Sequence, residues 1–129
     1  MKRCPIDNSI KMIGRKFTLH ILRNMILLKQ KRFSQFLGSI EGISTKTLSI
    51  RLNEMEKEGL ITRAVISTKP VQIEYYLTEK GEMFEPILKL LGELSAKYEP
   101  AIIFKNGKPR DFEDDVFGRN VRLSSVYDY

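Results

Sequence analysis

The stretch at residues 43–59, ISTKTLSIRLNEMEKEG, decides the fold of this chain. A helix over 45–58 is predicted, because the Ser44 hydroxyl can accept from a free backbone N–H at its start and Gly59 can adopt the left-handed conformation that ends it. At about 3.6 residues per turn, Leu48, Leu52 and Met55 share one face, which is expected to pack in the core. The opposite face, expected to meet a polar partner, consists of Lys46, Ser49, Ile50, Asn53 and Lys57.

The segments before this stretch supply further helices. Residues 17–28 have apolar side chains around much of a helical circumference and predict a core helix, preceded by a short segment over 7–13. Residues 33–40 predict a third short helix, and Gly42 gives a tight turn before the helix at 45–58. Two helices joined by such a turn, with the second one capped and polar on its outer face, are typical of a helix-turn-helix.

After Gly59 the apolar pattern changes from helical to strand-like. Residues 60–67 and 71–77 are rich in β-branched and aromatic side chains and predict a hairpin with Lys69 and Pro70 at its tip. Thr78 is the expected cap of a last helix over 79–98, with a kink near Gly81 and Pro86. The order of elements predicts an α+β, mainly α, fold: a winged helix-turn-helix with a C-terminal dimerisation helix.

The last helix carries an apolar stripe at intervals of three and four residues. Its members are Phe84, Ile87, Leu88, Leu91, Leu94 and Tyr98. A stripe of this size is more apolar surface than a monomer leaves in water, so it predicts a homodimer interface.

Length and composition indicate one domain. The chain has 129 residues, of which 42% are hydrophobic, and we expect residues 1–99 to form the winged-helix domain together with its dimerisation helix. Residues 100–129 are an extension, in which residues 101–104 followed by Asn106-Gly107 favour a small hairpin packed on the domain or its partner, with disorder as the alternative. No apolar run is long enough for a membrane helix, and the start MKRCPIDNSI lacks a signal-peptide core, so a cytoplasmic location is expected.

The basic charge is concentrated in the first part of the chain. Residues 1–77 hold 14 Lys and Arg against 6 Asp and Glu, a balance of +8, whereas residues 78–129 hold 8 against 10, a balance of −2. A basic surface attracts polyanions through counterion release, so double-stranded DNA is the first partner to consider. The alternative is that this charge only keeps the protein in solution.

Several side chains on and around the helix at 45–58 suit DNA contacts. Lys46 can reach guanine or phosphate, Ser49 and Asn53 can bond base edges, and the start of the helix suits phosphate. Ile50 either meets thymine methyl groups or packs on a neighbouring element, and Arg51 either holds phosphate or pairs with Glu54 or Glu58. The predicted DNA-binding set is Arg32, Ser44, Thr45, Lys46, Thr47, Ser49, Ile50, Arg51, Asn53, Arg63 and Lys69.

An ordered set of motifs runs through residues 4–98. It comprises Cys4-Pro5, Ile13-Gly14, Lys16-Phe17-Thr18, Arg32-Phe33, Gly42-Ile43-Ser44, Leu48, Arg51-Leu52, Gly59-Leu60, Arg63, Pro70-Val71, Glu74-Tyr75, Leu77-Thr78 and Gly81. This set resembles the HxlR-type winged-helix transcriptional regulators. The resemblance implies a cytosolic, homodimeric DNA-binding regulator that dimerises through its terminal helices. Because a two-fold dimer relates its two recognition helices by a dyad, we expect a roughly palindromic operator. Phe17 and Leu94 depart from the usual Trp, and Lys29-Gln30-Lys31 replaces a Gly-containing connector.

Cys4 is the one cysteine of the chain, so it is a free thiol or it pairs between chains. Lys2 and Arg3 favour its reactive thiolate form, and some relatives in the resembled family sense oxidants or electrophiles through a cysteine near the N-terminus. Cys4 is therefore a candidate redox sensor, with an inert packed thiol as the alternative.

Other function classes receive less support. The lone His20 lies within the apolar segment 17–28, and no second His or Cys completes a metal site, so we expect neither an enzyme nor a metal or cofactor. A winged helix that binds protein or RNA in place of DNA remains a further alternative, and a small-molecule effector cannot be named from these residues.

Overall fold

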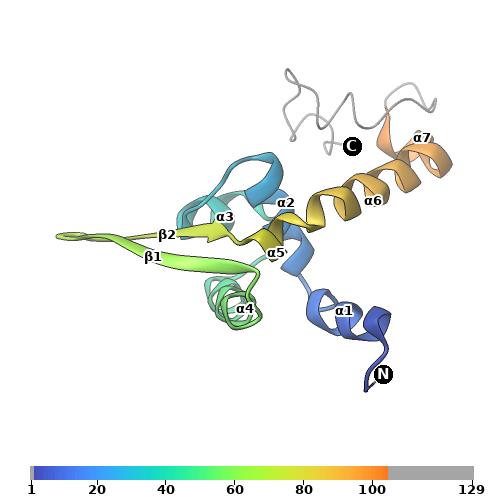
Figure 1. Ribbon diagram of the computed structural model, residues 1–129. Coiled ribbons are helices and arrows are strands. Elements are labelled where there is room, and N and C mark those ends of the chain that lie inside the picture. The colour runs from blue at the N-terminus through green and yellow to red at the C-terminus, as the bar shows by residue number, and fades with distance from the viewer. Residues whose placement is uncertain (1, 105–129) are drawn as a thin grey trace. The chain divides into compact units, whose positions relative to one another are not determined.

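The computed structural model describes residues 2–104 (Figure 1), and the chain divides between Glu82 and Met83 into two compact units. The first unit holds α1 (Pro5–Ile13), α2 (Thr18–Leu27), α3 (Phe33–Ser39), α4 (Thr45–Lys57), β1 (Ile61–Thr68), β2 (Val71–Leu77) and α5 (Glu79–Glu82). The second unit holds α6 (Phe84–Tyr98) and α7 (Pro100–Ile103). The predicted winged helix-turn-helix, with α3 and α4 as its two helices and the hairpin β1–β2 as its wing, is confirmed.

One apolar core joins α2, α3, α4 and the start of the wing. Its members are Ile21, Leu22, Met25, Ile26, Phe36, Ile40, Ile43, Leu48, Leu52, Met55, Leu60 and Ile61. Leu48, Leu52 and Met55, the predicted inner face of α4, are each no more than 1% exposed. Burial of a side chain of this size contributes about 1.5–3 kcal/mol, so the core fixes which side of α4 faces outward.

Both ends of α4 are closed as the sequence predicts. The Ser44 side chain accepts from the backbone N–H of Thr47 at 3.1 Å. At the other end Gly59 has φ 76°, and the N–H groups of Gly59 and Leu60 reach the carbonyls of Glu56 and Met55 at 3.0 and 2.9 Å. This is a Schellman motif, which satisfies carbonyls that the helix end would leave unpaired.

The connector between α2 and α3 is held by a buried amide. Asn24 is fully buried, and its Nδ2 donates to Gln30 Oε1 at 3.0 Å and to Ser39 Oγ at 2.8 Å. Lys29 has φ 56°, in the left-handed region that favours glycine. Lys29 thus adopts a conformation that glycine adopts more easily, in the connector where the resembled family has glycine. The hydrogen bonds of Asn24 hold this connector in place.

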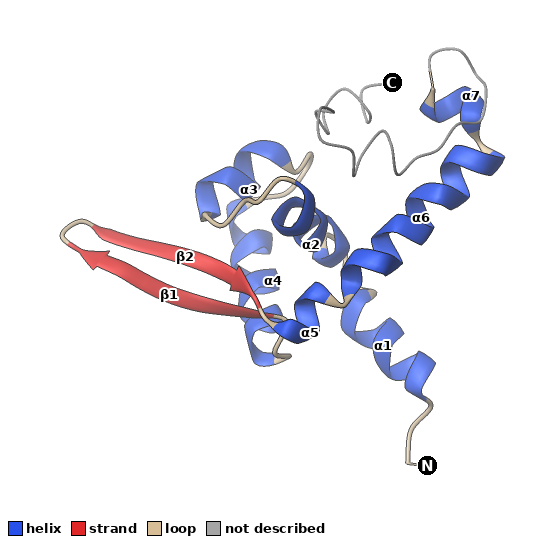
Figure 2. Cartoon of the chain, turned by 45° about the horizontal axis from the view of Figure 1, so that its top comes forward, coloured by secondary structure: helices blue, strands red, loops and turns tan. Residues whose placement is uncertain are grey.

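The wing is an antiparallel hairpin that projects from the helices as a long arm, shown in red in Figure 2. Its register pairs Ile61 with Leu77 at the base and Thr68 with Val71 at the tip, with an irregularity between Val65 and Ser67. Both strands were predicted, but β1 begins and ends one residue later than expected. Leu60 is excluded from the strand because its N–H closes the end of α4.

The predicted kink in the last helix is confirmed as a break into α5 and α6. Thr78 Oγ1 accepts from the Gly81 N–H at 3.1 Å, which is the expected cap. In a continuous helix the N–H of residue 86 would donate to the carbonyl of Glu82, but Pro86 has no N–H. The break places Pro86 in the first turn of α6, where proline is tolerated.

The predicted hairpin of the extension is wrong in its first part. Pro100–Ile103 forms the short helix α7 and not a strand. Asn106, Gly107 and the apolar residues that follow lie outside the described residues. Among residues 2–104, no helix has the length and apolar character needed to cross a membrane.

Candidate nucleic-acid interface

The outward side of α4 carries most of the predicted base-reading side chains. Lys46, Ser49, Ile50 and Asn53 of the predicted polar face are exposed, as is Lys57 near the end of the helix. Thr45, predicted on the flank of this face, is exposed as well, and we call Thr45, Lys46, Ser49, Ile50 and Asn53 the recognition face. Ile50 is 41% exposed, so it is not packed in the core of the described chain. A lysine, a hydroxyl and an amide on one exposed helical face match the donors and acceptors of the DNA major groove.

Ser44 and Thr47 serve the start of the helix. Besides the cap, the Ser44 hydroxyl donates to Thr47 Oγ1 at 3.0 Å, and the Thr47 side chain is half-buried. Their hydroxyls are thus bonded to each other and lie at the N-terminal end of α4, where the orientation of the backbone N–H groups favours anions.

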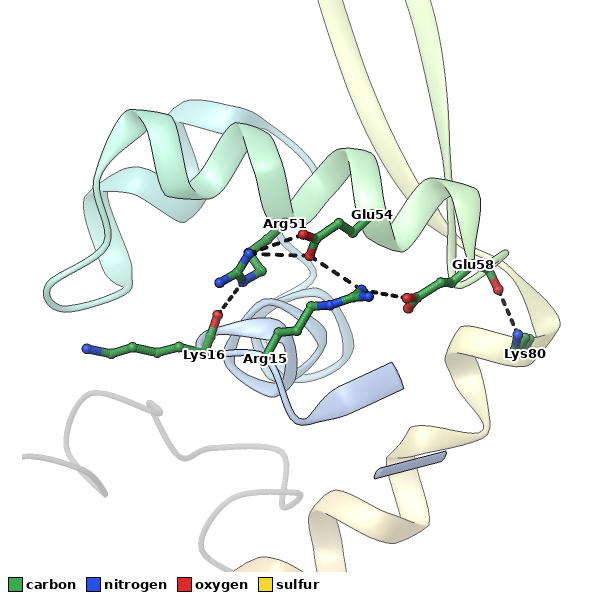
Figure 3. Close-up of polar contacts among 6 residues, drawn as sticks. All are labelled: Arg15, Lys16, Arg51, Glu54, Glu58 and Lys80. Carbon is green, nitrogen blue, oxygen red and sulfur yellow. Dashed lines mark hydrogen bonds and ion pairs between the residues drawn. The ribbon is translucent and has the colours of Figure 1, made fainter. Parts of the chain in front are cut away.

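Arg51 lies apart from the recognition face. Its Nε donates to the main-chain oxygen of Lys16 at 2.7 Å, and its Nη1 lies 3.3 Å from Glu54 Oε2 (Figure 3). Only 19% of the Arg51 side chain is exposed. Arg51 was predicted either to hold phosphate or to pair with Glu54 or Glu58, and in the structure it pairs with Glu54.

The same network extends to the turn between α1 and α2. Arg15 Nη1 lies 2.6 Å from Glu58 Oε1 and 3.5 Å from Glu54 Oε2, and Lys80 donates to the main-chain oxygen of Glu58 at 2.7 Å (Figure 3). The hydrogen bond and the charge of Glu58 raise the pKa of Arg15. The Arg15 contacts hold α4 against the turn before α2, and the Lys80 contact joins the end of α4 to α5. Sequence reasoning missed the roles of Arg15, Lys16 and Lys80.

The predicted wing cations are exposed along the hairpin. Arg63 lies on β1 opposite Tyr75, and Lys69 lies at the tip beside Pro70, across a cis peptide bond. Both side chains are therefore accessible to a polyanion, on a wing whose strand β1 packs on α4.

Arg32 immediately precedes α3 and belongs to a cluster around Glu74, which lies midway along β2 opposite Ala64. Glu74 Oε2 is 3.3 Å from Lys31 Nζ and 3.5 Å from Arg32 Nε, while Oε1 accepts from the Tyr76 hydroxyl. The Tyr76 hydrogen bond, followed by Lys31 and Arg32, holds the pKa of Glu74 below its usual value despite burial. The same hydrogen bond raises the pKa of Tyr76. Sequence reasoning missed this arrangement; the one available signal was an acidic residue within the apolar strand VQIEYYL.

Cys4 is exposed and immediately precedes α1. Its main-chain oxygen accepts from the Asn8 N–H at 3.0 Å, which begins the helix. No residue of α1 is buried, and Ile6 and Ile10 are 70% and 56% exposed. The Cys4 thiol is therefore not packed against the described residues, which contradicts the alternative of a packed thiol.

The predicted dimer stripe lies on α6, in the second unit. Ile87, Leu91, Leu94 and Tyr98 are 39%, 45%, 58% and 69% exposed, and Leu88 is half-buried. Phe84 differs, because it is only 5% exposed and presents little surface to a partner. Leu90, which was not predicted, adds an apolar side chain that is 66% exposed.

Comparison with known proteins agrees with this architecture. The sequence profile described as HxlR-like helix-turn-helix matches residues 12–102. The chain belongs to the HxlR-like helix-turn-helix family. The match to the HxlR profile begins after Cys4 and extends beyond Tyr98, so it covers the winged helix, α6 and most of α7.

Individual proteins similar to this chain are also transcriptional regulators or redox regulators by name. The HTH-type transcriptional regulator sll1512 of Synechocystis sp. is 34% identical over 95 residues, which are 74% of this chain and 70% of that protein. The reduced form of the Bacillus subtilis regulator YodB has a TM-score of 0.63 at 28% identity, covering 76% of this chain and 97% of that one. The oxidised form of the redox regulator HypR has a TM-score of 0.65 at 29% identity, covering 74% and 98%. This HxlR-family protein is a DNA-binding helix-turn-helix transcriptional regulator.

Proposed function

We propose that this protein is a sequence-specific regulator that acts in the cytoplasm as a homodimer on a roughly palindromic operator. The observation that carries the proposal is the recognition face, on which Lys46, Ser49 and Asn53 are exposed on a helix whose other side is locked in the core. The net charge of +8 over residues 1–77 attracts DNA regardless of the DNA sequence.

The side chains of the recognition face have different roles in this proposal. Lys46 donates to guanine O6 and N7, Asn53 pairs with adenine N6 and N7, and Ser49 bonds a further base edge. Ile50 contacts thymine methyl groups, since its exposed side chain has the required apolar character. Thr45 lies at the helix start, where together with Ser44 and Thr47 it meets a phosphate.

Cations around α4 position the protein on the duplex. Arg63 and Lys69 on the wing and Arg32 before α3 contact phosphate, which fixes the register of the protein on DNA without reading sequence. Arg51 contributes indirectly by holding α4 through Lys16 and Glu54.

The apolar side chains of α6 close the homodimer in this proposal. Ile87, Leu91, Leu94 and Tyr98 supply a continuous exposed stripe, and a two-fold interface presents the same stripe from both chains. Two recognition faces related by a dyad require two half-sites, with centres about one helical turn, or ~34 Å, apart.

Cys4 is proposed to make DNA binding responsive to oxidants or electrophiles. Its thiol is exposed at the start of α1, and HypR, to which this chain is similar, is a redox regulator. No resolving cysteine exists in the same chain, so oxidation must join two subunits or capture a small thiol. Diamide treatment should change operator affinity in the wild type but not in Cys4→Ser, and equal responses in both proteins would rule out this role.

Selection of bound sites from a random DNA pool tests the main proposal. The expected product is one enriched sequence with two-fold symmetry that binds the dimer more tightly than either isolated half-site. A pool without an enriched sequence, or full affinity for a single half-site, would contradict the proposed mode of binding.

A further inference from the structure

One acidic side chain in the basic first unit is arranged to support two cations. Glu74 has a side chain that is 7% exposed, whereas those of Lys31 and Arg32 are 49% and 45% exposed. The carboxylate is thus largely covered, while the two cationic side chains are about half exposed. One anion beside two cations leaves a net positive charge beside the middle of β2.

Every oxygen of that carboxylate is occupied. The two cations converge on Oε2, and Tyr76 donates its hydroxyl proton to Oε1. The backbone also contributes, because the Tyr75 N–H donates to the main-chain oxygen of Lys31 at 2.7 Å and joins this segment to β2. Position and orientation of both cationic side chains are therefore set by β2.

Stability alone is a weak explanation for this arrangement. Ion pairs whose cationic partner is about half exposed add little to the free energy of unfolding. Lysine and arginine side chains lose much rotamer freedom when they bind phosphate, and holding them in place beforehand reduces that loss.

We propose that Glu74 is a positioning residue for DNA binding, which holds Lys31 and Arg32 side by side as a two-cation contact for phosphate. This inference rests on the proposed function, and it adds Lys31 to the DNA-contacting set. Tyr76 takes part by orienting the carboxylate from the opposite oxygen.

The inference predicts an effect opposite in sign to simple electrostatics. Glu74→Gln removes a negative charge, which by itself should tighten binding to a polyanion. We expect instead that its Kd for random duplex rises about three- to tenfold, because both cations lose their support. Glu41→Gln is the matched control: it makes the same charge change at an exposed site, and its Kd should stay the same or fall.

Two further variants separate positioning from folding. Tyr76→Phe leaves the charge and the ring unchanged, so a rise in Kd of about threefold reports loss of the hydrogen bond alone. In the Lys31→Ala/Arg32→Ala background, Glu74→Gln should no longer weaken binding, since no cations remain to be positioned. Thermal unfolding identifies any variant that fails to fold, and Tyr76→Phe then decides the question.

The possible results are distinguishable. Wild-type protein that binds no duplex at low salt would overturn the proposed function together with this inference. Wild-type protein that binds, beside Glu74→Gln that binds as tightly or more tightly, overturns the inference alone. A weakening that persists in the Lys31→Ala/Arg32→Ala background would also overturn it.

Discussion

Arg51 on α4 donates to the main-chain oxygen of Lys16 at 2.7 Å, so the helix that bears the recognition face is held by the turn preceding α2. The two residues lie 35 positions apart in the sequence. This contact orients α4 from its partly buried side and leaves the exposed side for a ligand, which separates the residue that positions the helix from those proposed to read DNA.

Arg51→Ala should lower the free energy of unfolding by about 1–3 kcal/mol, because it removes the donor to Lys16 and leaves Glu54 without this partner. Asn53→Ala, two positions further along the same helix but exposed, should change stability by no more than about 0.5 kcal/mol. Urea unfolding of both variants measures the difference. Equal losses would show that the Lys16 contact adds nothing to stability.

Two glycines should respond to alanine in opposite directions. A Cβ added at Gly81 would lie 2.2 Å from the main-chain oxygen of Leu60, so Gly81→Ala should cost about 1–3 kcal/mol of stability. A Cβ at Gly38 in α3 would meet no atom within 4 Å, and Gly38→Ala should stabilise by about 0.5–1 kcal/mol. Thermal melts compare the two, and a Gly81→Ala protein as stable as the wild type would contradict the packing of α5 on Leu60.

Leu91→Glu should convert the proposed dimer into monomers, because a charged side chain in the middle of an apolar interface loses its hydration. Glu93→Gln, at an exposed polar site on the same helix, is the control and should remain dimeric. Sedimentation velocity gives the assembly state, and circular dichroism confirms that each variant is folded. A folded, dimeric Leu91→Glu protein would require an interface elsewhere.

The pH dependence of stability should reveal the Glu74 cluster. The pKa of Glu74 in the folded protein is lowered from 4.5, so its ionised form stabilises the fold. That contribution is fully present above about pH 4.5 and is lost as the pH falls through the lower folded value. The stability difference between wild type and Glu74→Gln, measured by urea unfolding from pH 7 to pH 3, should therefore shrink at the acidic end. A difference that does not vary with pH would contradict the stabilisation of the Glu74 carboxylate by the Tyr76 hydrogen bond and, to a smaller extent, by Lys31 and Arg32.

Features encoded by near neighbours could be predicted from the sequence. The Ser44 cap, the left-handed Gly59 and the inner face of α4 depend on residues within one helix, and all three were predicted. The start of β1 was missed by one residue, because the N–H of Leu60 bonds Met55 and so belongs to the helix end.

Features that depend on distant pairs could not be predicted. Arg15 and Glu58 are 43 positions apart, and nothing in either local sequence indicates that they meet. The same holds for Glu74 and Lys31, which are brought together when β2 packs beside the connector after α2. Composition gave the sign of the charge in this region, but only the fold shows which cations are held and by what.

The central claim, that the recognition face reads bases, is tested most directly by Lys46→Ala. Binding to the selected operator and to random duplex should be measured at one salt concentration for wild type, Lys46→Ala and Lys69→Ala. If Lys46 contacts a base, its loss costs about 1–3 kcal/mol of operator binding and reduces the ratio of the two affinities. Lys69→Ala should weaken both affinities alike and leave that ratio unchanged. An unchanged ratio in Lys46→Ala would contradict base reading by this residue.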